Sequence, residues 1–361
     1  MATPHAREHM PKHARTVHRL ALILLAATIP AIGATPGFAG GESERDGAPD
    51  EIVIGFQAIP NGEIVAKNLG WHEETLGAPV RWVQFNSGSE LNSAVAAGSV
   101  DLGLGGSSTT VAAIAQGVPA EVIWIYDIIG DNEALVVRDG AGIESFEDLE
   151  GRRVAAPFGA TTHYHLLAAL RLNDVDPADV TVMDLSPSDM LAAWQRGDID
   201  AGFVWEPTLA AMLDLGGEVL VSSREIAAAG FPTGDIGIVH ERFGRRHPDV
   251  VVQYLKNQIR AVELIRAEPG RAARAVAQEF GLSAGEAQRQ MGTLVFLDGE
   301  EQLQPEYLGT GETPGTFAEV FLETARFLEE QDTIRTAPEL EVFEEAINTS
   351  FLERAVRERD G

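Results

Sequence analysis

Short apolar, β-branched segments alternate with helical segments over most of the chain, and this alternation limits the fold more than any other feature. Segments with strand character begin near residues 51, 80, 100, 120, 133, 152, 180, 199 and 218, and helical segments separate most of them. Connections of this length are typical of parallel βαβ units and open α/β sheets. From about Phe243 the apolar residues recur at helical spacing, so the sequence predicts an α/β protein with a helical C-terminal region.

An internal sequence repeat divides the alternating region into two parts. The segments LNSAVAAGSVDLG (91–103) and MLAAWQRGDIDAG (190–202) both run from a helix through glycine, a β-branched residue and aspartate to a second glycine. Each leads into a strand that ends in a polar cluster, GGSS (105–108) and WEP (205–207). Open α/β sheets bind ligands at the carboxyl ends of their strands. The repeat therefore predicts two lobes with a cleft between them. We expect its two aspartates, Asp101 and Asp200, to stabilise turns.

Two predicted helix starts carry more polar side chains than a helix cap needs. Ser107 and Ser108 lead into TTVAAIAQ, and Thr161, Thr162 and His163 follow the turn PFGA. A helix N-terminus presents free N–H groups and a partial positive charge, so it favours anions. Two such starts facing one cleft would hold a small tetrahedral or planar anion, and ordinary N-capping by the serines is the alternative.

Enzymatic interpretations have little support in the sequence. It has neither a Gly-x-Ser-x-Gly elbow nor a His-Glu-x-x-His motif, and it has no cysteine for a thiolate nucleophile or a metal. His163 and His165 are two residues apart, so on a helix their rings point to nearly opposite sides and cannot share a metal. A triad of Ser108, His163 and Asp235 has no local motif behind it. We therefore expect a binding protein that is not an enzyme and that has no cofactor and no metal.

Length and charge limit the partners. The chain has 361 residues, of which 45% are hydrophobic, which is enough for two packed domains with their own cores. Its formal net charge of -28 argues against nucleic acid or an anionic membrane surface as a partner.

The N-terminal segment predicts export from the cytoplasm. Several basic residues precede LALILLAATIPAIGA, which is too short and too interrupted to span a bilayer comfortably. The small residues of GFAGG follow, so we predict a signal peptide over 1–39 with cleavage after Ala39. A polar leader over 40–49 then precedes the working protein, which we expect in a periplasm.

Four segments carry a resemblance to a known family. They are NEALVV (132–137), PFGATTHYHLLAAL (157–170), AAWQRGDIDAGFVW (192–205) and FPTGD (231–235). With them, residues 50–361 resemble the periplasmic taurine-binding proteins of ABC importers, within the wider family that binds aliphatic sulfonates and nitrate. The resemblance implies a two-lobed periplasmic binding protein (type II, venus-flytrap). Lobe 1 would take 50–136 plus 238–361, and lobe 2 would take 137–237.

The resemblance also implies which residues bind the ligand. A sulfonate would be held by the two helix starts, through Ser107, Ser108, Thr161, Thr162 and His163. The taurine ammonium would meet Glu133, Asp235 and the face of Trp205, and Gln57 would add a polar side chain at the cleft. Glu206 departs from the small apolar residue expected there in taurine binders. Because Pro207 follows, Glu206 is better explained as the start of the next helix.

These features predict a receptor that captures taurine and delivers it to ABC permease subunits in the inner membrane, acting as a monomer. The alternative within the class is a receptor for an alkanesulfonate, nitrate or another small anion. The alternative from another class is an enzyme on the same fold, similar to the pyrimidine synthases.

Overall fold

A computed structural model describes residues 48–359. The predicted signal peptide, its cleavage site after Ala39 and most of the predicted leader lie outside the described residues. Among the residues described, none of the helices combines the length and the apolar character needed to cross a membrane.

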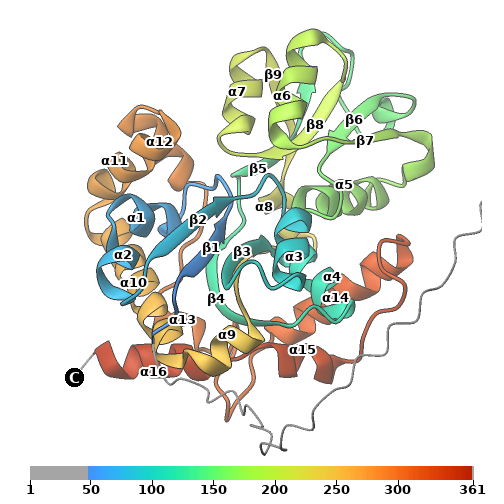
Figure 1. Ribbon diagram of the computed structural model, residues 1–361. Coiled ribbons are helices and arrows are strands. Elements are labelled where there is room, and N and C mark those ends of the chain that lie inside the picture. The colour runs from blue at the N-terminus through green and yellow to red at the C-terminus, as the bar shows by residue number, and fades with distance from the viewer. Residues whose placement is uncertain (1–47, 360–361) are drawn as a thin grey trace, which may run out of the picture. The chain divides into compact units, whose positions relative to one another are not determined.

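The strands of the described chain form two five-stranded sheets (Figure 1). The first has the order β2 (Val80–Gln84), β1 (Ile52–Phe56), β3 (Leu102–Gly106), β10 (Gly234–His240) and β4 (Ala120–Ile128). The second has the order β7 (Thr181–Asp184), β6 (Arg153–Ala156), β8 (Ala201–Trp205), β5 (Glu133–Arg138) and β9 (Gly217–Ser222). The predicted strands are all present, and β10 is a strand that sequence reasoning missed.

Each sheet contains one reversed strand, and this strand is the first one that the chain forms after crossing over from the other sheet. In the first sheet β10 runs antiparallel to β3 and β4, and in the second β5 runs antiparallel to β8 and β9. The remaining pairs are parallel, as the βαβ pattern predicts. The sheets are therefore mixed rather than wholly parallel.

The sheets to which β5 and β10 belong fix where the chain passes between the sheets. It does so at residues 129–132, after β4, and at residues 229–233, before β10. The lobe boundaries expected from the sequence, at 136/137 and 237/238, cut through β5 and β10, which each belong to a single sheet. We propose lobe boundaries within the two crossovers instead.

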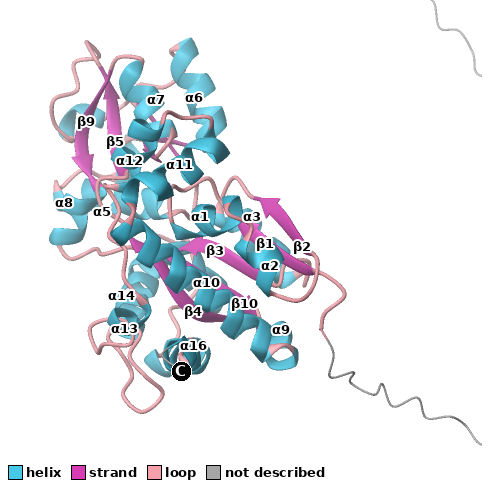
Figure 2. Cartoon of the chain, turned by 90° about the vertical axis from the view of Figure 1, so that its left-hand side faces the viewer, coloured by secondary structure: helices cyan, strands magenta, loops and turns pink. Residues whose placement is uncertain are grey.

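Helices surround the strands of both sheets (Figure 2). Those before β10 are α1 (Gly62–Asn68), α2 (Trp71–Thr75), α3 (Gly88–Ala96), α4 (Ser107–Ala115), α5 (Thr161–Leu172), α6 (Pro187–Arg196), α7 (Thr208–Asp214) and α8 (Ser223–Ala228). The predicted helical C-terminal region is α9 (Glu241–Arg246), α10 (Pro248–Ala267), α11 (Pro269–Phe280), α12 (Ala284–Met291), α13 (Gly299–Gln302), α14 (Phe317–Glu330), α15 (Leu340–Ala346) and α16 (Ser350–Arg359).

Burial explains the composition of the strands. Every residue of β1, β3 and β8 is buried, and these strands occupy inner positions in their sheets. The edge strands β2 and β7 have no fully buried residue. Strands covered on both faces have few polar residues, as in β1 and β8, whereas edge strands keep polar residues on their open side.

The two copies of the internal sequence repeat occupy equivalent positions in the two sheets. They cover α3 with β3 in one sheet and α6 with β8 in the other. The Oδ2 atom of Asp101 accepts a hydrogen bond from the backbone N–H of Val53 at 2.9 Å, and Oδ2 of Asp200 accepts one from that of Arg153, also at 2.9 Å. These aspartates therefore tie neighbouring strands together rather than closing a turn.

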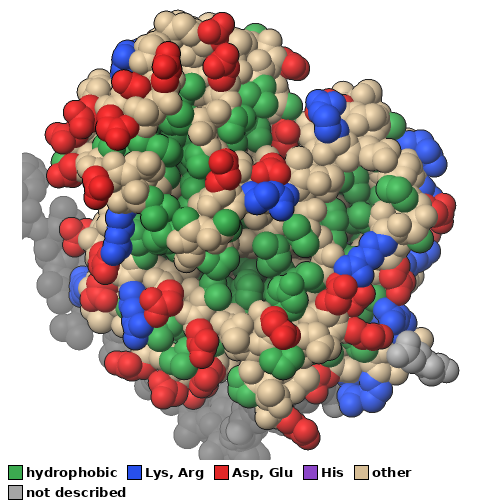
Figure 3. Space-filling model, turned by 180° about the vertical axis from the view of Figure 1, so that it is seen from behind, with side chains coloured by type: hydrophobic (Ala, Val, Ile, Leu, Met, Phe, Trp, Pro, Cys, Tyr) green, Lys and Arg blue, Asp and Glu red, His purple; other side chains and the backbone are tan. Residues whose placement is uncertain are grey.

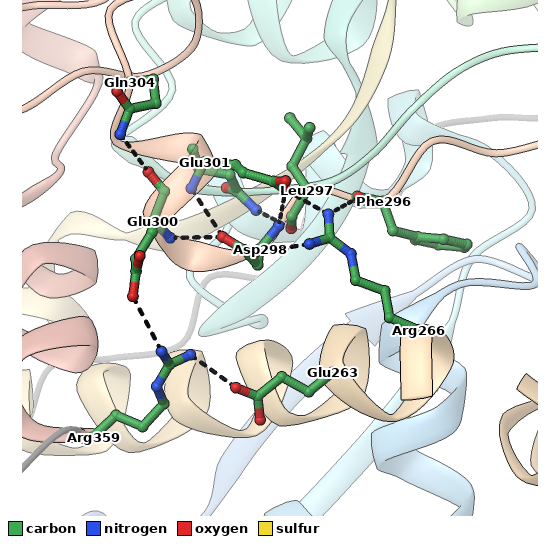
Figure 4. A network of polar contacts seen from close by, with 10 residues as sticks. Glu263, Arg266, Phe296, Leu297, Asp298, Glu300, Glu301, Gln304 and Arg359 are labelled. Carbon is green, nitrogen blue, oxygen red and sulfur yellow. Dashed lines mark hydrogen bonds and ion pairs between the residues drawn. The ribbon is translucent and has the colours of Figure 1, made fainter. Parts of the chain in front are cut away.

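A polar network joins three C-terminal helices (Figure 4). The guanidinium group of Arg266, on α10, donates to the carboxylate of Asp298 and to the carbonyl of Phe296, both at 2.7 Å. Arg359 on α16 donates to Glu263 of α10 at 2.9 Å and to Glu300 of α13 at 3.3 Å. The network is solvent-exposed, so we expect a modest contribution to stability.

Acidic side chains are spread over the surface. Figure 3 shows many Asp and Glu side chains on the rear face, with hydrophobic side chains exposed between them. Carboxylates in water need no partner, so most of the net charge of -28 carries little cost. The few acids that are buried are therefore the informative ones.

Candidate functional site

A pocket lies between residues of the two sheets and their helices. It measures about 260 Å³, part of it open to solvent, and its lining residues are Gln57, Ile59, Gly88, Gly106, Thr109, Glu133, Ala160, Thr161, Trp205 and Asp235. Five of the nine site residues predicted from the sequence line it, namely Gln57, Glu133, Thr161, Trp205 and Asp235.

The two reversed strands bring carboxyl groups to this pocket. Glu133 is the first residue of β5 and lies opposite Trp205, at the end of β8. Asp235 near the start of β10 lies between Gly106 of β3 and Asp127 of β4. Because a reversed strand begins where its parallel neighbours end, its first residues reach the edge of the sheet that open α/β proteins use for ligands.

Three carboxyl groups are buried together without a cation. The exposed fractions of Asp127, Glu133 and Asp235 are 0%, 3% and 4%. Burial and, after it, the charge of Asp235 raise the pKa of Glu133 to about 8, although hydrogen bonds that the ionised carboxylate accepts from Thr161 and Ser223 act against the rise. In the described part of the chain, none of the three forms an ion pair with lysine, arginine or histidine.

Asp127 and Asp235 form a carboxyl pair. Burial raises the pKa of Asp235 to about 7, and a hydrogen bond with Asp127 opposes that rise. Burial and the charge of Asp235 raise the pKa of Asp127 well above its usual range. Two carboxyls can hydrogen-bond to each other only when one keeps a proton. Asn61 donates to the Oδ2 atom of Asp127 at 3.1 Å, and this hydrogen bond holds the Asp127 side chain in place.

The starts of α4 and α5 are not capped by side chains. Their N-cap residues are Gly106 and Ala160, both of which line the pocket, and neither can supply a capping oxygen. The serines that were expected as alternative caps lie one position further on, inside α4. Both helix starts therefore offer free backbone N–H groups, which attract an anion.

Ser107 and Ser108 have different partners. The Oγ atom of Ser107 accepts a hydrogen bond from the backbone N–H of Gly234 at 3.3 Å, which leaves its own hydrogen available. The hydroxyl of Ser108 donates to the carbonyl of Gly159 at 3.0 Å. Ser108 thus ties the start of α4 to the turn before α5, across the two sheets.

Thr161 and Thr162 also differ. The hydroxyl of Thr161 donates to the Oε1 atom of Glu133 at 2.7 Å, inside the pocket. Thr162 is fully buried, and its Oγ1 atom has no hydrogen-bond partner among the described residues. It does not line the pocket.

The structure does not bring His163 into the pocket. Its ring stacks on Phe158 with centroids 4.6 Å apart, and the backbone N–H of Gly159 donates to its Nδ1 atom at 3.3 Å. Burial lowers the pKa of His163 to about 4. The reason is helical geometry, because two positions after Thr161 a side chain has turned to nearly the opposite side of α5. The predicted contact between His163 and the anion therefore has no support in the ligand-free geometry.

Gln57 and Trp205 complete the pocket as predicted. The side-chain amide of Gln57 donates to the carbonyl of Leu104 at 3.2 Å, which leaves its Oε1 atom to accept from a ligand. Trp205 is 7% exposed and presents its ring at the end of β8. An indole face is a favourable neighbour for an ammonium group.

Glu206 has the structural role expected of it. Its Oε2 atom accepts a hydrogen bond at 2.9 Å from the backbone N–H of Ala210, in the first turn of α7. Burial raises its pKa to about 7. It does not line the pocket, so its departure from the family pattern has no direct effect on the lining.

Sequence reasoning missed a hydrogen-bonded chain behind Glu133. The Oγ atom of Ser223 lies 3.3 Å from the Oε2 atom of Glu133 and 2.7 Å from Nδ1 of His165. Nε2 of His165 lies 2.9 Å from the carbonyl oxygen of Phe231, in the second crossover. His165 and His163 do face opposite sides of α5, as predicted. No sequence signal marked Ser223, because a serine at a helix start is common.

The pocket combines two chemically different features. Two free helix starts favour an anion, and the carboxyls beside them, which have no counter-ion, favour a cation. Two α/β sheets, each with one reversed strand, and a pocket between them define the class of two-lobed solute-binding proteins. Comparison with known sequences and structures identifies the family within this class.

The sequence profile described as NMT1/THI5 like matches residues 60–272. The chain is also 34% identical over 289 residues to the taurine-binding periplasmic protein of Escherichia coli (strain K12), covering 78% of this chain and 87% of that protein. The chain therefore belongs to the NMT1/THI5-like family, and the resemblance to taurine- and sulfonate-binding periplasmic proteins is confirmed.

Solved structures confirm the predicted fold. The alkanesulfonate-binding protein SsuA from Xanthomonas axonopodis pv. citri, bound to MOPS, is similar with a TM-score of 0.69 at 22% identity, covering 84% of this chain and 99% of that one. The desulfurization enzyme DSZB has a TM-score of 0.58 at 15% identity, covering 86% and 100%. One fold thus includes binding proteins and an enzyme.

The buried carboxyls predict that the ligand-free protein loses stability as pH rises. Glu133 holds its proton more tightly in the folded chain, with a pKa of about 8 against 4.5 for the ordinary side chain. Between these values the folded state binds more protons than the unfolded state, so the free energy of unfolding falls, by about 5 kcal/mol for this one group. Glu133→Gln, which resembles the protonated acid, should flatten the decline between about pH 5 and 8 in denaturant titrations.

Glu312→Gln is the matched control, because Glu312 is exposed. It makes the same Glu-to-Gln change at an exposed position and should keep the wild-type pH dependence. A wild-type slope in Glu133→Gln would show that Glu133 ionises normally in the empty pocket.

Proposed function

We propose that this protein is a periplasmic solute-binding protein that captures taurine and delivers it to an ABC permease. The observation that carries the proposal is the pairing, in one pocket, of two uncapped helix starts with buried carboxyls that have no counter-ion. A small zwitterion satisfies both features at once. A ligand with a single charge leaves one of them without a partner.

The anionic end of the ligand is matched by donors on both helix starts. A sulfonate has three oxygens around one sulfur, so it can accept from several N–H groups at once. Because one helix start comes from each sheet, the same anion contacts both lobes. We expect it to favour their closure.

The ammonium end is matched by acceptors. Glu133 and Asp235 line the pocket as carboxyl groups, and Oε1 of Gln57 supplies a neutral acceptor. Trp205 adds an aromatic face. We assign Asp127 to holding Asp235 in place rather than to contact with the ligand, because it does not line the pocket.

Two further parts of the proposal rest on sequence and relatives. The predicted signal peptide over 1–39 and the likeness to a protein named as a taurine-binding periplasmic protein support a periplasmic location. A permease partner in the inner membrane and a monomeric state follow from the same resemblance. A receptor for an alkanesulfonate, nitrate or another small anion is the alternative ligand class, and the uncompensated carboxyls argue against it.

Asp235→Asn should separate taurine from ligands that lack the ammonium group. The variant keeps the shape of the side chain and removes its charge, so taurine affinity should fall by about 2–5 kcal/mol, as for breaking a buried charge pair. Ethanesulfonate has no cation at that position and should lose little affinity, or gain some. Isothermal titration of both ligands against wild type and variant measures the difference.

The exposed Asp139 provides the control. Asp139→Asn should leave both affinities unchanged. Equal losses for the two ligands in Asp235→Asn would mean that Asp235 shapes the pocket without binding an amine, and a wild-type preference for ethanesulfonate would overturn taurine as the ligand.

We also propose that the bound molecule leaves unchanged, although the likeness to DSZB makes an enzyme the second candidate. Ser108 and His163, two members of the triad considered from the sequence, have separate partners, the carbonyl and the N–H of Gly159. Mass spectrometry of the small molecules released on denaturation after incubation with taurine distinguishes the two. Unmodified taurine is expected, and a converted product would establish catalysis.

A further inference from the structure

Glu133, Ser223 and His165 form a chain of hydrogen bonds, and the groups around it determine which atom donates in each bond. A carbonyl oxygen can only accept, so the Nε2 atom of His165 must carry the hydrogen that points to Phe231. Burial lowers the pKa of His165 to about 4, so the ring is neutral and its Nδ1 atom has no hydrogen. Nδ1 must therefore accept from Ser223, at 2.7 Å.

The single hydrogen of Ser223 is then committed to His165. Its Oγ atom, 3.3 Å from the Oε2 atom of Glu133, can only accept from that side. The other carboxyl oxygen of Glu133 already accepts from Thr161 at 2.7 Å. Oε2 is therefore the atom that carries a proton when the pocket is empty.

Ionisation of Glu133 would reverse this arrangement. The hydroxyl of Ser223 would have to turn toward the carboxylate, and Nδ1 of His165, which is fully buried, would lose its donor. A buried acceptor without a donor costs about 1–3 kcal/mol. An ammonium group beside Glu133 offsets this cost, and an uncharged group does not.

The charges around Glu133 agree with this account. Asp235 on β10 and Asp127 on β4 face it as acids and disfavour a further negative charge. His165 on α5 is neutral. Arg224, next to Ser223 on α8, pairs with Asp131 at 2.8 Å on the surface.

We propose that His165 and Ser223 are positioning residues that keep Glu133 protonated in the empty pocket. Binding of a sulfonate that also carries an ammonium group then releases a proton, and binding of a sulfonate without an ammonium group does not. This inference rests on the proposed function. It makes the preference for taurine over ethanesulfonate depend on pH. As pH rises toward 8, the proton that taurine must displace is held less often, so the preference increases and then levels off.

Two substitutions of one residue separate positioning from a merely structural role. Asparagine at 165 can place its carbonyl oxygen where Nδ1 lies, so His165→Asn keeps an acceptor for Ser223. Glutamine reaches the position of Nε2, so His165→Gln keeps the hydrogen bond to Phe231 but frees the hydroxyl of Ser223 for Glu133. Only His165→Gln should make Glu133 a stronger acid.

The experiment is isothermal titration near pH 7 in buffers of different ionisation enthalpy, which counts the protons exchanged on binding. In wild type and His165→Asn, taurine should release about one proton, and ethanesulfonate should release none. In His165→Gln the release by taurine should fall to less than about half. Carbon-13 NMR titration of the Glu133 carboxyl in ligand-free protein, assigned with Glu133→Gln, should show its midpoint at lower pH in His165→Gln alone.

Each alternative result is decisive. Taurine binding without proton release in wild type would overturn the coupling while leaving the proposed function intact. Absence of taurine binding would overturn both the ligand and the coupling, and the ligand-free titration would still decide the role of His165. Equal midpoints in wild type and His165→Gln would show that His165 only fills space.

Discussion

The burial of carboxyl groups without a counter-ion is the constraint on which the rest of the site depends. Asp127, Glu133 and Asp235 are almost entirely inaccessible and none forms an ion pair in the described chain. Such groups keep protons or wait for a cation, since a bare buried carboxylate is strongly disfavoured. The reversal of β5 and β10 creates this arrangement, because it brings an acid near the start of each strand to the edge where the neighbouring strands end.

The pocket residues also connect to both segments that join the two sheets. Glu133 follows directly on the first crossover, and its hydrogen-bonded chain ends at Phe231 in the second. Ser108 joins the helix start of one sheet to the turn before the helix start of the other. A ligand that contacts the helix starts and the carboxyls therefore acts on the segments that connect the lobes, which is where hinge motion concentrates.

The sequence was sufficient for the architecture and for five lining residues, because those depend on local pattern and on segments shared with relatives. It did not predict β10, whose glycines at 234 and 237 obscure a strand that pairs on both sides. It missed Asp127 and the pair of Ser223 and His165, since their roles come from contacts between distant segments. It placed His163 in the pocket because the family resemblance assigns three consecutive residues to the site, whereas helical spacing turns His163 away from the side that Thr161 takes.

The orientation of bound taurine tests the central claim most directly. A crystal structure of the complex should place the sulfonate at the first turns of α4 and α5, and the ammonium nitrogen within hydrogen-bonding distance of Glu133 or Asp235. A sulfonate beside those carboxyls, or taurine bound outside the pocket lined by Gly106 and Ala160, would contradict it.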